Sequence, residues 1–436
     1  MLPVKRFIFL LLLLTAFASR AQTTYFPPLI GTAWDTVSAT SLGWCPDQLD
    51  SLLDYVGQRN SKAFLLLKDG KIVAERYYGT FTVDSLWYWA SAGKSLTAFL
   101  TGLAQESGFL SIDDTTSSYL GQGWTSCTAQ QEERITIRNQ LTMTTGLNDG
   151  VPDKDCTDNT CLQYLADAGT RWAYHNAPYT LLDPVIESAT GRTLTQFFNQ
   201  RLTSTTGMTG FYFQSGYNNV FVSKPRSMAR FGLLMLNRGH WNGTAVMNDS
   251  LYFNAMVNSS QSLNPSYGYL WWLNGKTSFM APGFQLQFPG SWSPAAPPDM
   301  FAAMGKNGQM LNIVPSMNLV WLRMGEEPNG NLVPFLFNDT IWQKLNAVMC
   351  SSTSIITPTL ADEIAVFPSV AAYTVSITSP ACRLQVMDAS GRMVYQLPLD
   401  GTLTNVPLDA IQNGIYFFRF VTVDGRVALK KVIVSR

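Results

Sequence analysis

Histidine is scarce in this chain, and so are the patterns that hold metals. Only His175 and His240 occur among 436 residues, and neither stands in an H-E-x-x-H arrangement. None of the six cysteines belongs to a C-x-x-C pair. Because zinc sites are built from such spacings, we expect neither a metal nor another cofactor. Because the chain has only two histidines and no G-x-S-x-G motif, we do not expect a Ser-His-Asp triad.

The chain also has no excess of positive or negative charge. Thirty Lys and Arg residues balance thirty Asp and Glu residues, so the formal net charge is zero. No basic run is long enough to follow a nucleic-acid backbone, so we expect no nucleic acid among the partners. Charged residues make up 14% of the chain and hydrophobic residues 46%, which suffices for a sizeable globular core.

Long apolar runs are missing except near the N-terminus. Two basic residues precede an apolar run at 7–14, and Ser19-Arg20-Ala21 follows it. This is the pattern of a secretory signal peptide, so we expect residues 1–21 to be removed and the mature chain to begin near Gln22. The alternative, a retained membrane anchor, is disfavoured because the run is too short to span. We expect no transmembrane segment in the mature chain.

Composition divides the chain near residue 350. The stretch that follows is rich in Ser, Thr and Pro, which is typical of a linker, and after it only short strands and turns are predicted. We therefore expect a large domain at 22–350, a linker at 351–363 and a small C-terminal β-sandwich at 364–436. The strands of the sandwich are predicted at 374–377, 384–387, 393–397, 415–423 and 427–434.

The large domain has strand patterns at both ends and helical patterns between them. The fold class we expect is α/β: one antiparallel sheet built from both ends of the domain and flanked by helices, with a mostly helical subdomain beside it and a cleft between the two lobes. The strands are predicted at 63–78 (a hairpin), 300–304, 310–314 and 319–324, and the helices at 95–108, within 134–207 and at 335–348.

The six cysteines permit disulfides in an exported protein. Cys156 and Cys161 bracket a short polar loop that a bridge can close, and we predict this pair. Cys45 and Cys350 lie near the two ends of the large domain. The sequence does not decide whether they form a second bridge. The other two cysteines are left unassigned.

Ser91-Ala92-Gly93-Lys94 carries an S-x-x-K spacing at the start of an apolar helical segment. On a helix that begins near Ser91, Ser91 and Lys94 project from the same face. A serine hydroxyl must lose its proton as it attacks, and a lysine can accept that proton once burial favours its neutral form. The alternative is a helix-capping serine followed by a surface lysine. We predict Ser91 as a nucleophile and Lys94 as its base.

A tyrosine and an amide stand two residues apart in the stretch from Trp172 to Asn176. Tyr174 can carry a proton if nearby cations stabilise its phenolate, and Asn176 can orient Lys94 or a substrate amide. The same Y-x-N spacing occurs at 217–219 and 252–254, so an ordinary loop is the alternative at each place.

Lys306-Asn307-Gly308 lies between two predicted strands. A lysine there can hold the phenolate of Tyr174 or a substrate carboxylate, and Gly308 lets a substrate backbone lie against the strand edge. Lys68-Asp69-Gly70 repeats the pattern inside the turn of the first hairpin, where we interpret it as structural. A solvated turn lysine is the alternative for Lys306 too.

Taken in order, S-x-x-K, W-x-Y-x-N and K-x-G resemble the serine β-lactamase, penicillin-binding-protein and D-alanyl-D-alanine carboxypeptidase superfamily, in the tyrosine version found in class C β-lactamases and related hydrolases. The resemblance covers about 34–348 and includes the stretch 135–147, which is similar to the family's I-T-I-R-x-L-L-T-x-T-S-G-L segment. It implies that Ser91, Lys94, Tyr174 and Lys306 are catalytic and that Asn176 and Gly308 bind substrate.

The mechanism that the resemblance implies is an acyl-enzyme reaction. Ser91 would attack a carbonyl, Lys94 and Tyr174 would manage the proton, and water would later release the acyl group. By analogy with the family, the backbone N–H groups of Ser91 and Gln309 would form the oxyanion hole.

Two departures from the family pattern bear on the substrate. The third motif is K-N-G instead of K-T-G, and His175 replaces the serine of Y-S-N, which weakens the expectation of β-lactam recognition. The expected substrate is a small ester, amide or peptide, cleaved by an esterase, a D-Ala-D-Ala carboxypeptidase-like enzyme or a linear amide hydrolase. The alternative is a catalytically inactive relative that binds peptidoglycan or another cell-surface polymer.

The C-terminal region has its own resemblance. The blocks at 366–369, 386–391, 413–417 and 430–434 are similar to the type A sorting domain of the type IX secretion system of Bacteroidota. This implies that the secretion machinery is a partner through 364–436 and that the protein is secreted or held at the cell surface. A carbohydrate-binding or stalk β-sandwich is the alternative.

Overall fold

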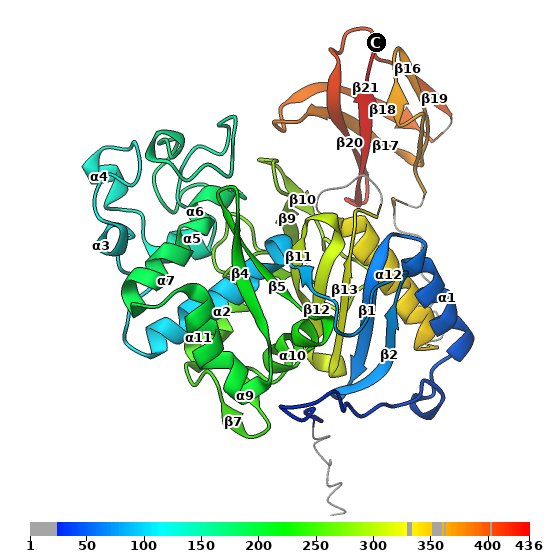
Figure 1. Cartoon of the computed structure of the whole chain (residues 1–436). Coiled ribbons are helices and arrows are strands. Elements are labelled where there is room, and N and C mark those ends of the chain that lie inside the picture. The colour runs from blue at the N-terminus through cyan, green and yellow to red at the C-terminus, as the bar shows by residue number, and fades with distance from the viewer. Residues whose placement is uncertain (1–23, 329–333, 351–359, 362, 402) are drawn as a thin grey trace, which may run out of the picture.

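The computed structural model describes residues 24–328, 334–350, 360–361, 363–401 and 403–436 (Figure 1). The expected signal peptide at 1–21 and most of the expected linker at 351–363 lie outside these residues. Within the described part of the chain, no helix has both the length and the apolar character needed to cross a membrane.

A six-stranded antiparallel sheet forms the centre of the large domain, in the order β2-β1-β13-β12-β11-β8. Every residue of the three central strands is buried, because helices cover both faces of the sheet. The predicted hairpin and the three later strands are confirmed, so both ends of the domain do build one sheet. The bounds are β1 Ser61–Lys68, β2 Lys71–Tyr77, β8 Trp272–Leu273, β11 Phe301–Gly305, β12 Gln309–Val314 and β13 Leu319–Gly325.

Two helices from opposite ends of the domain cover one face of the sheet (Figure 1). They are α1, Pro46–Gly57, and α12, Phe335–Val348, the predicted closing helix. Trp321 of β13 packs on Trp342 of α12 with ring centroids 6.2 Å apart. The Cys45–Cys350 disulfide joins the start of α1 to the residues just after α12, so this open pairing is confirmed, as is Cys156–Cys161.

The other face of the sheet is covered by α10, Pro225–Leu236. A Cβ on Gly232 would lie 2.5 Å from Val320 Cγ1, so only glycine allows the helix to lie this close to β13. Next to it runs α2, Gly93–Glu106, in which every residue from Gly93 to Ala104 is buried. A helix buried all round lies inside the protein, here between the sheet and the helical subdomain.

The helical subdomain is built from short helices, and it also contains a hairpin that the sequence patterns did not predict. The hairpin pairs β4, Gly210–Ser215, with β5, Asn218–Ser223, and β3, Trp87–Tyr88, joins it. Each strand has an apolar run of only three residues, Phe-Tyr-Phe or Val-Phe-Val, between Gly, Asn, Gln and Ser, so the strand signal is short. The helices are α3 Ser117–Leu120, α4 Ala129–Glu132, α5 Ile137–Leu141, α6 Asn176–Thr180, α7 Leu182–Thr190, α8 Leu194–Phe198, α9 Ser204–Thr206 and α11 Ser250–Met256.

The C-terminal domain is a sandwich of two sheets, ordered β14-β16-β19 and β15-β21-β20-β17-β18, around its own apolar core. The predicted sandwich is therefore confirmed. The predicted strands are β16 Thr374–Thr378, β17 Ala381–Asp388, β18 Met393–Asp400, β20 Gly414–Thr422 and β21 Val427–Val434. The shorter strands β14 Ala365–Phe367, β15 Val370–Ala371 and β19 Thr404–Pro407 were not predicted.

The C-terminal domain packs against one hairpin of the large domain, made by β9, Ser278–Met280, and β10, Gln287–Pro289 (Figure 1). The Phe417 ring lies 5.3 Å from that of Phe284 and 5.6 Å from that of Phe288, measured between centroids. Aromatic rings that meet edge to face at these distances contribute beyond the area that they bury. This aromatic cluster therefore docks the two domains.

We predict that Phe417→Ala in the full chain loosens this contact, because it removes the ring shared by both hairpin phenylalanines. Hydrogen exchange of the amides in 278–289 should speed up several-fold while exchange in the central sheet stays unchanged. Ile415→Ala, at a partly exposed position of the same strand, is the control. Equal exchange in both variants and the unchanged protein would contradict the docking.

Candidate active site

Ser91 lies in a single 3₁₀ turn, Ala90–Ala92, that leads directly into α2. The expected helix at 95–108 therefore starts slightly earlier, with Ser91 in the turn that precedes it. Ala90 has a φ of 47°, a left-handed conformation that costs an alanine about 1 kcal/mol and so requires support from its surroundings. The support includes Trp89, whose N–H donates to Phe221 O at 2.9 Å and whose Nε1 donates to Ser223 Oγ at 2.8 Å.

Lys94 and Ser91 are brought together as predicted. Lys94 Nζ lies 3.0 Å from Ser91 Oγ, within hydrogen-bond distance, and the lysine is only 3% exposed. The pKa of Lys94 is lowered to about 7, chiefly by burial; the charges of Asp155 and Asp183 act to raise it, and the Lys306 charge adds to the lowering. A large fraction of Lys94 is therefore the neutral amine near neutral pH, as a base for Ser91 requires.

Two tyrosine rings enclose the amine. Lys94 Nζ lies 4.1 Å from the ring centroid of Tyr179 and 5.2 Å from that of Tyr174. Tyr179 belongs to α6 and was not among the predicted site residues, because no motif distinguishes it from an apolar helix position. Burial raises the pKa of Tyr179 well above its ordinary value, so both its ring and its hydroxyl are neutral neighbours.

Tyr174 lies beside Ser91, but the structure does not favour a phenolate there. Its ring stacks on Trp272 with centroids 5.9 Å apart. Burial raises the pKa of Tyr174 to about 12, and a hydrogen bond with Ser91 offsets this only in part. Desolvation therefore favours a protonated hydroxyl in this state, and the role of Tyr174 as a proton carrier stays a prediction.

Asn176 is the first residue of α6, and its side chain forms a hydrogen bond with a carboxylate. Its Nδ2 donates to Asp155 Oδ1 at 2.7 Å, and its own Oδ1 is buried with no hydrogen-bond partner among the described residues. Among the described residues, its hydrogen bond thus goes to Asp155 and not to Lys94. Asp155 was not predicted as a site residue; the nearest signal was the disulfide loop that begins at the next residue, Cys156.

The Lys306-Asn307-Gly308 segment forms the turn between β11 and β12. Lys306 is exposed, and its charge acts on Lys94 as described above. Asn307 Nδ2 donates to the Tyr88 hydroxyl at 2.7 Å, which ties the turn to β3. Gly308 has a φ of 75°, and a Cβ there would lie 2.5 Å from Arg323 Nη1. The glycine is therefore required both by the backbone and by the guanidinium beside it.

Arg323 holds this turn from the inside of the protein, although no motif pointed to it. The side chain is fully buried, and burial lowers its pKa to about 10. A buried guanidinium needs all five of its N–H groups satisfied. Its five hydrogen bonds go to Asn307 O at 2.6 Å, Gly308 O at 3.0 Å, Arg59 O at 2.6 Å, Glu326 O at 2.9 Å and Ser61 Oγ at 2.9 Å.

The strand β11 reaches Ser91 at Gly305. A Cβ on Gly305 would lie 2.6 Å from Trp89 O and 3.1 Å from Ser91 N, so the backbone here passes directly over the turn that holds Ser91. Gln309 pairs with Gly305 across the hairpin and is fully buried. Its side-chain Nε2 donates to the Gly325 carbonyl at 2.6 Å, and its Oε1 accepts from the Gly325 N–H at 3.0 Å.

Within the described residues, no group of three or more His, Cys, Asp and Glu side chains is arranged to hold a metal ion. His175 is buried, neither ring nitrogen is hydrogen-bonded to a residue that the structure describes, and burial lowers its pKa to about 4. It is therefore a neutral ring at neutral pH.

Comparison with known protein families agrees with this geometry. Residues 49–325 match the β-lactamase family, and residues 366–435 match a secretion system C-terminal sorting domain. Both expected resemblances are thus confirmed. No curated protein matches the chain in sequence.

Solved structures share the fold at low sequence identity. A protein assigned as a 6-aminohexanoate-dimer hydrolase from Bacillus anthracis is 17% identical, with a TM-score of 0.55 over 74% of this chain and 89% of its own. A protein assigned as a β-lactamase from Bacteroides dorei DSM 17855 is 17% identical, with a TM-score of 0.56 over 70% and 99%.

An octameric penicillin-binding protein homologue from Pyrococcus abyssi is 13% identical, with a TM-score of 0.53 over 90% of this chain and 96% of its own. These likenesses concern the fold. Together with the match over 49–325 and the Ser91–Lys94 pair, they lead to one conclusion: the chain belongs to the β-lactamase family and ends in a secretion system sorting domain.

Proposed function

We propose that this protein is a serine hydrolase that cleaves an ester or a linear amide through an acyl-enzyme on Ser91. The observation that carries the proposal is the 3.0 Å approach of Lys94 Nζ to Ser91 Oγ, combined with the lowered pKa of that lysine. A serine paired with a largely neutral amine has the base that nucleophilic attack requires. Membership of the β-lactamase family supports the same chemistry.

In the proposed reaction, Ser91 Oγ bonds to the substrate carbonyl carbon while its proton passes to Lys94. The tetrahedral intermediate then expels the alcohol or amine, which takes a proton relayed from Lys94 with help from the protonated Tyr174 hydroxyl. Water attacks the resulting ester, gives up a proton to the same groups and releases the acid. Ser91 regains its proton, so the cycle needs no cofactor.

The oxyanion hole is proposed to include the backbone N–H of Ser91. The family resemblance assigns the second donor to the N–H of Gln309, which remains a proposal. Gly305, which pairs with Gln309 across the hairpin, comes close to Ser91 N, and this supports a second donor from the same hairpin. Arg323 would hold that turn in place.

The exposed Lys306 ammonium is proposed to contact a carboxylate or another polar group of the substrate. Asn176 is proposed to bind substrate as the family resemblance implies, although in this structure its Nδ2 donates to Asp155 Oδ1 and its Oδ1 is buried. Gly308 would act indirectly, by leaving room for Arg323.

We propose the division of the chain into a signal peptide at 1–21, a hydrolase domain at 22–350, a linker at 351–363 and a sorting domain at 364–436. The match of the C-terminal residues to a sorting domain supports export by a type IX secretion system and a secreted or surface location. An extracellular substrate, such as a peptide or ester of the surroundings, follows from that location.

The covalent step is tested with a fluorophosphonate probe on the full mature chain. We expect stoichiometric labelling of the unchanged protein and none of Ser91→Ala. Ser95→Ala is the matched control, because Ser95 lies on the same buried helix but donates to Leu270 O at 2.8 Å, so its loss should leave labelling intact. An unlabelled wild-type protein would favour the inactive, polymer-binding alternative.

The labelling rate should rise with pH, with a midpoint near pH 7. Burial lowers the pKa of Lys94 to about 7, and only the neutral amine can accept the proton of Ser91, so protonation at lower pH removes the base. Lys94→Met should lower the rate about 10²-fold or more at every pH. A rate that does not change between about pH 5 and about pH 8 would contradict the role of Lys94.

A substrate panel tests the specificity. We expect turnover of p-nitrophenyl esters and weak or no turnover of a chromogenic cephalosporin, because the K-N-G motif lacks the threonine hydroxyl of K-T-G. D-Ala-D-Ala peptides and linear amides complete the panel, with Ser91→Ala as the blank. Efficient cephalosporin turnover would overturn this preference.

A further inference from the structure

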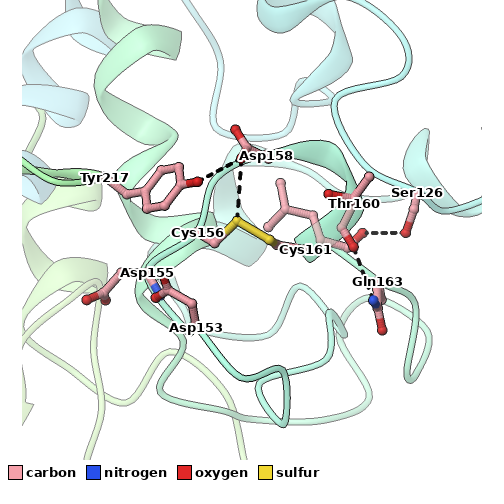
Figure 2. Close-up of a disulfide and its surroundings, with 10 residues drawn as sticks. Ser126, Asp153, Asp155, Cys156, Asp158, Thr160, Cys161, Gln163 and Tyr217 are labelled. Atoms are coloured by element: carbon pink, nitrogen blue, oxygen red, sulfur yellow. Dashed lines mark hydrogen bonds between the residues drawn. A yellow bond between two sulfur atoms is a disulfide. The ribbon is translucent and has the colours of Figure 1, made fainter.

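A cavity of about 540 Å³ lies in the helical subdomain, a volume typical of small-molecule sites. Its walls come from the end of α6, from α7, from the start of α8, from the β4–β5 hairpin and from the loop closed by the Cys156–Cys161 disulfide. Inside that loop, Asp158 Oδ2 accepts from the hydroxyl of Tyr217 in the hairpin turn at 2.7 Å (Figure 2). Two walls of the cavity are therefore tied to each other.

Asp183 of α7 lines this cavity and is only 3% exposed. Neither of its carboxyl oxygens has a hydrogen-bond partner among the described residues. The hydroxyl of Tyr212, which also lines the cavity, is buried without such a partner as well. A buried polar group without a hydrogen bond costs free energy, and folded proteins leave few of them. These two side chains therefore offer hydrogen-bonding capacity to whatever fills the cavity.

A second carboxylate lines the same cavity. Glu187 follows Asp183 by four residues on α7, so the two side chains project from one face of the helix. Glu187 Oε1 accepts from Leu194 N at 2.8 Å, which holds this carboxylate at the wall. None of the described residues that line the cavity is Lys, Arg or His. The cavity thus brings two acidic groups together without a cation of its own.

The protonation of Asp183 depends on groups from several elements. Burial raises its pKa well above the ordinary value, and the Glu187 charge acts in the same direction. Asn219 of β5, Lys94 of α2 and Thr97 of α2 act against them. Asn219 and Thr97 lie near the carboxyl, but neither meets it in hydrogen-bond geometry. These effects favour the protonated carboxyl, and a cation beside it would favour the charged form.

Two tyrosines also lie near Asp183 and are neutral. They are Tyr179 of α6 and Tyr212 of β4, and burial raises the pKa of each well above its ordinary value. Among the neighbours named, Glu187 and Lys94 are therefore the ones that carry charge near neutral pH. Lys94 belongs to the buried helix α2 and is not among the residues that line the cavity.

We propose that this cavity binds an organic ammonium ion, a primary amine on a short carbon chain, with its charged head between Asp183 and Glu187. An ammonium group has three N–H donors, and the two carboxyl groups and the Tyr212 hydroxyl supply acceptors for them. The carbon chain occupies the rest of a volume far larger than one ammonium group requires. This site goes beyond the proposed hydrolase and does not depend on it.

Other occupants fit the cavity less well. Among the described residues, no group of three or more His, Cys, Asp and Glu side chains can hold a metal ion, which favours an organic cation. A neutral polyol would satisfy hydrogen bonds but would leave two acidic groups of one helix face without an opposite charge. An ammonium ion meets both needs, because it donates hydrogen bonds and carries the opposite charge.

Calorimetric titration of the full mature chain with n-butylammonium chloride tests the site. We expect saturable binding of one equivalent. The neutral control is 1-butanol, which has the same number of non-hydrogen atoms, and we expect at least tenfold weaker binding because it lacks the charge. Sodium chloride keeps the ionic strength constant. Equal binding of both molecules, or saturable binding of neither, would overturn the proposal.

Variants test the two carboxyl groups. Asp183→Asn retains the shape and should weaken n-butylammonium binding at least tenfold. Glu187→Gln can still accept from Leu194 N and should weaken binding several-fold. Glu133→Gln, an exposed position that does not line the cavity, is the matched control and should bind as the unchanged protein does. Unchanged affinity in Asp183→Asn, or an equal loss in Glu133→Gln, would contradict the site.

A direct readout locates the bound amine in the unchanged protein, so it does not rely on the folding of any acidic variant. We expect intermolecular NOEs between the butyl methylene protons and the ring protons of Tyr212, which Tyr212→Phe assigns. NOEs to the ring of Tyr174 instead would place the amine beside the Ser91–Lys94 pair and overturn the proposal. Because neither experiment uses the fluorophosphonate probe, a protein that the probe does not label could still bind the amine.

Discussion

Burial of one amine is the constraint on which the rest of the site depends. Lys94 lies on a helix with no exposed face, between the sheet and the helical subdomain, with two tyrosine rings against it. Removing a lysine from water disfavours its charged form, and this brings its pKa into the neutral range. In the proposed reaction, the helix must therefore be covered on every side before Ser91 has a base, and both lobes of the large domain provide that cover.

The second requirement is a rigid frame around the buried pair. Gly305 brings the end of β11 onto the turn that holds Ser91, and Arg323 ties the next turn to the carbonyl groups around it. On the other side, the residues just before the Cys156–Cys161 bridge are joined to α6. Each anchor is far in sequence from the group that it positions, so the site is assembled by the packing of the whole domain.

Sequence patterns predicted the arrangement of site residues correctly where those residues are close together in the chain. Ser91 and Lys94 are three residues apart, so any helical turn brings them together, and the scarcity of histidine pointed to lysine as the base. Arg323, Asp155 and Tyr179 left no such signal. An arginine inside an apolar strand, an aspartate in a polar loop and a tyrosine on a buried helix look ordinary until their neighbours are known.

By itself the sequence determined the division into a large domain and a sorting sandwich, the central sheet built from both ends of the large domain, and the order of the three motifs. Only the tertiary structure decided the protonation of the groups in those motifs. The pKa of Lys94 is lowered to about 7, whereas that of Tyr174 is raised to about 12, so the tyrosine keeps its proton. Both shifts come from desolvation, which depends on everything packed around a side chain. Spacing along one helix is a property of a few residues, but burial is a property of the whole fold.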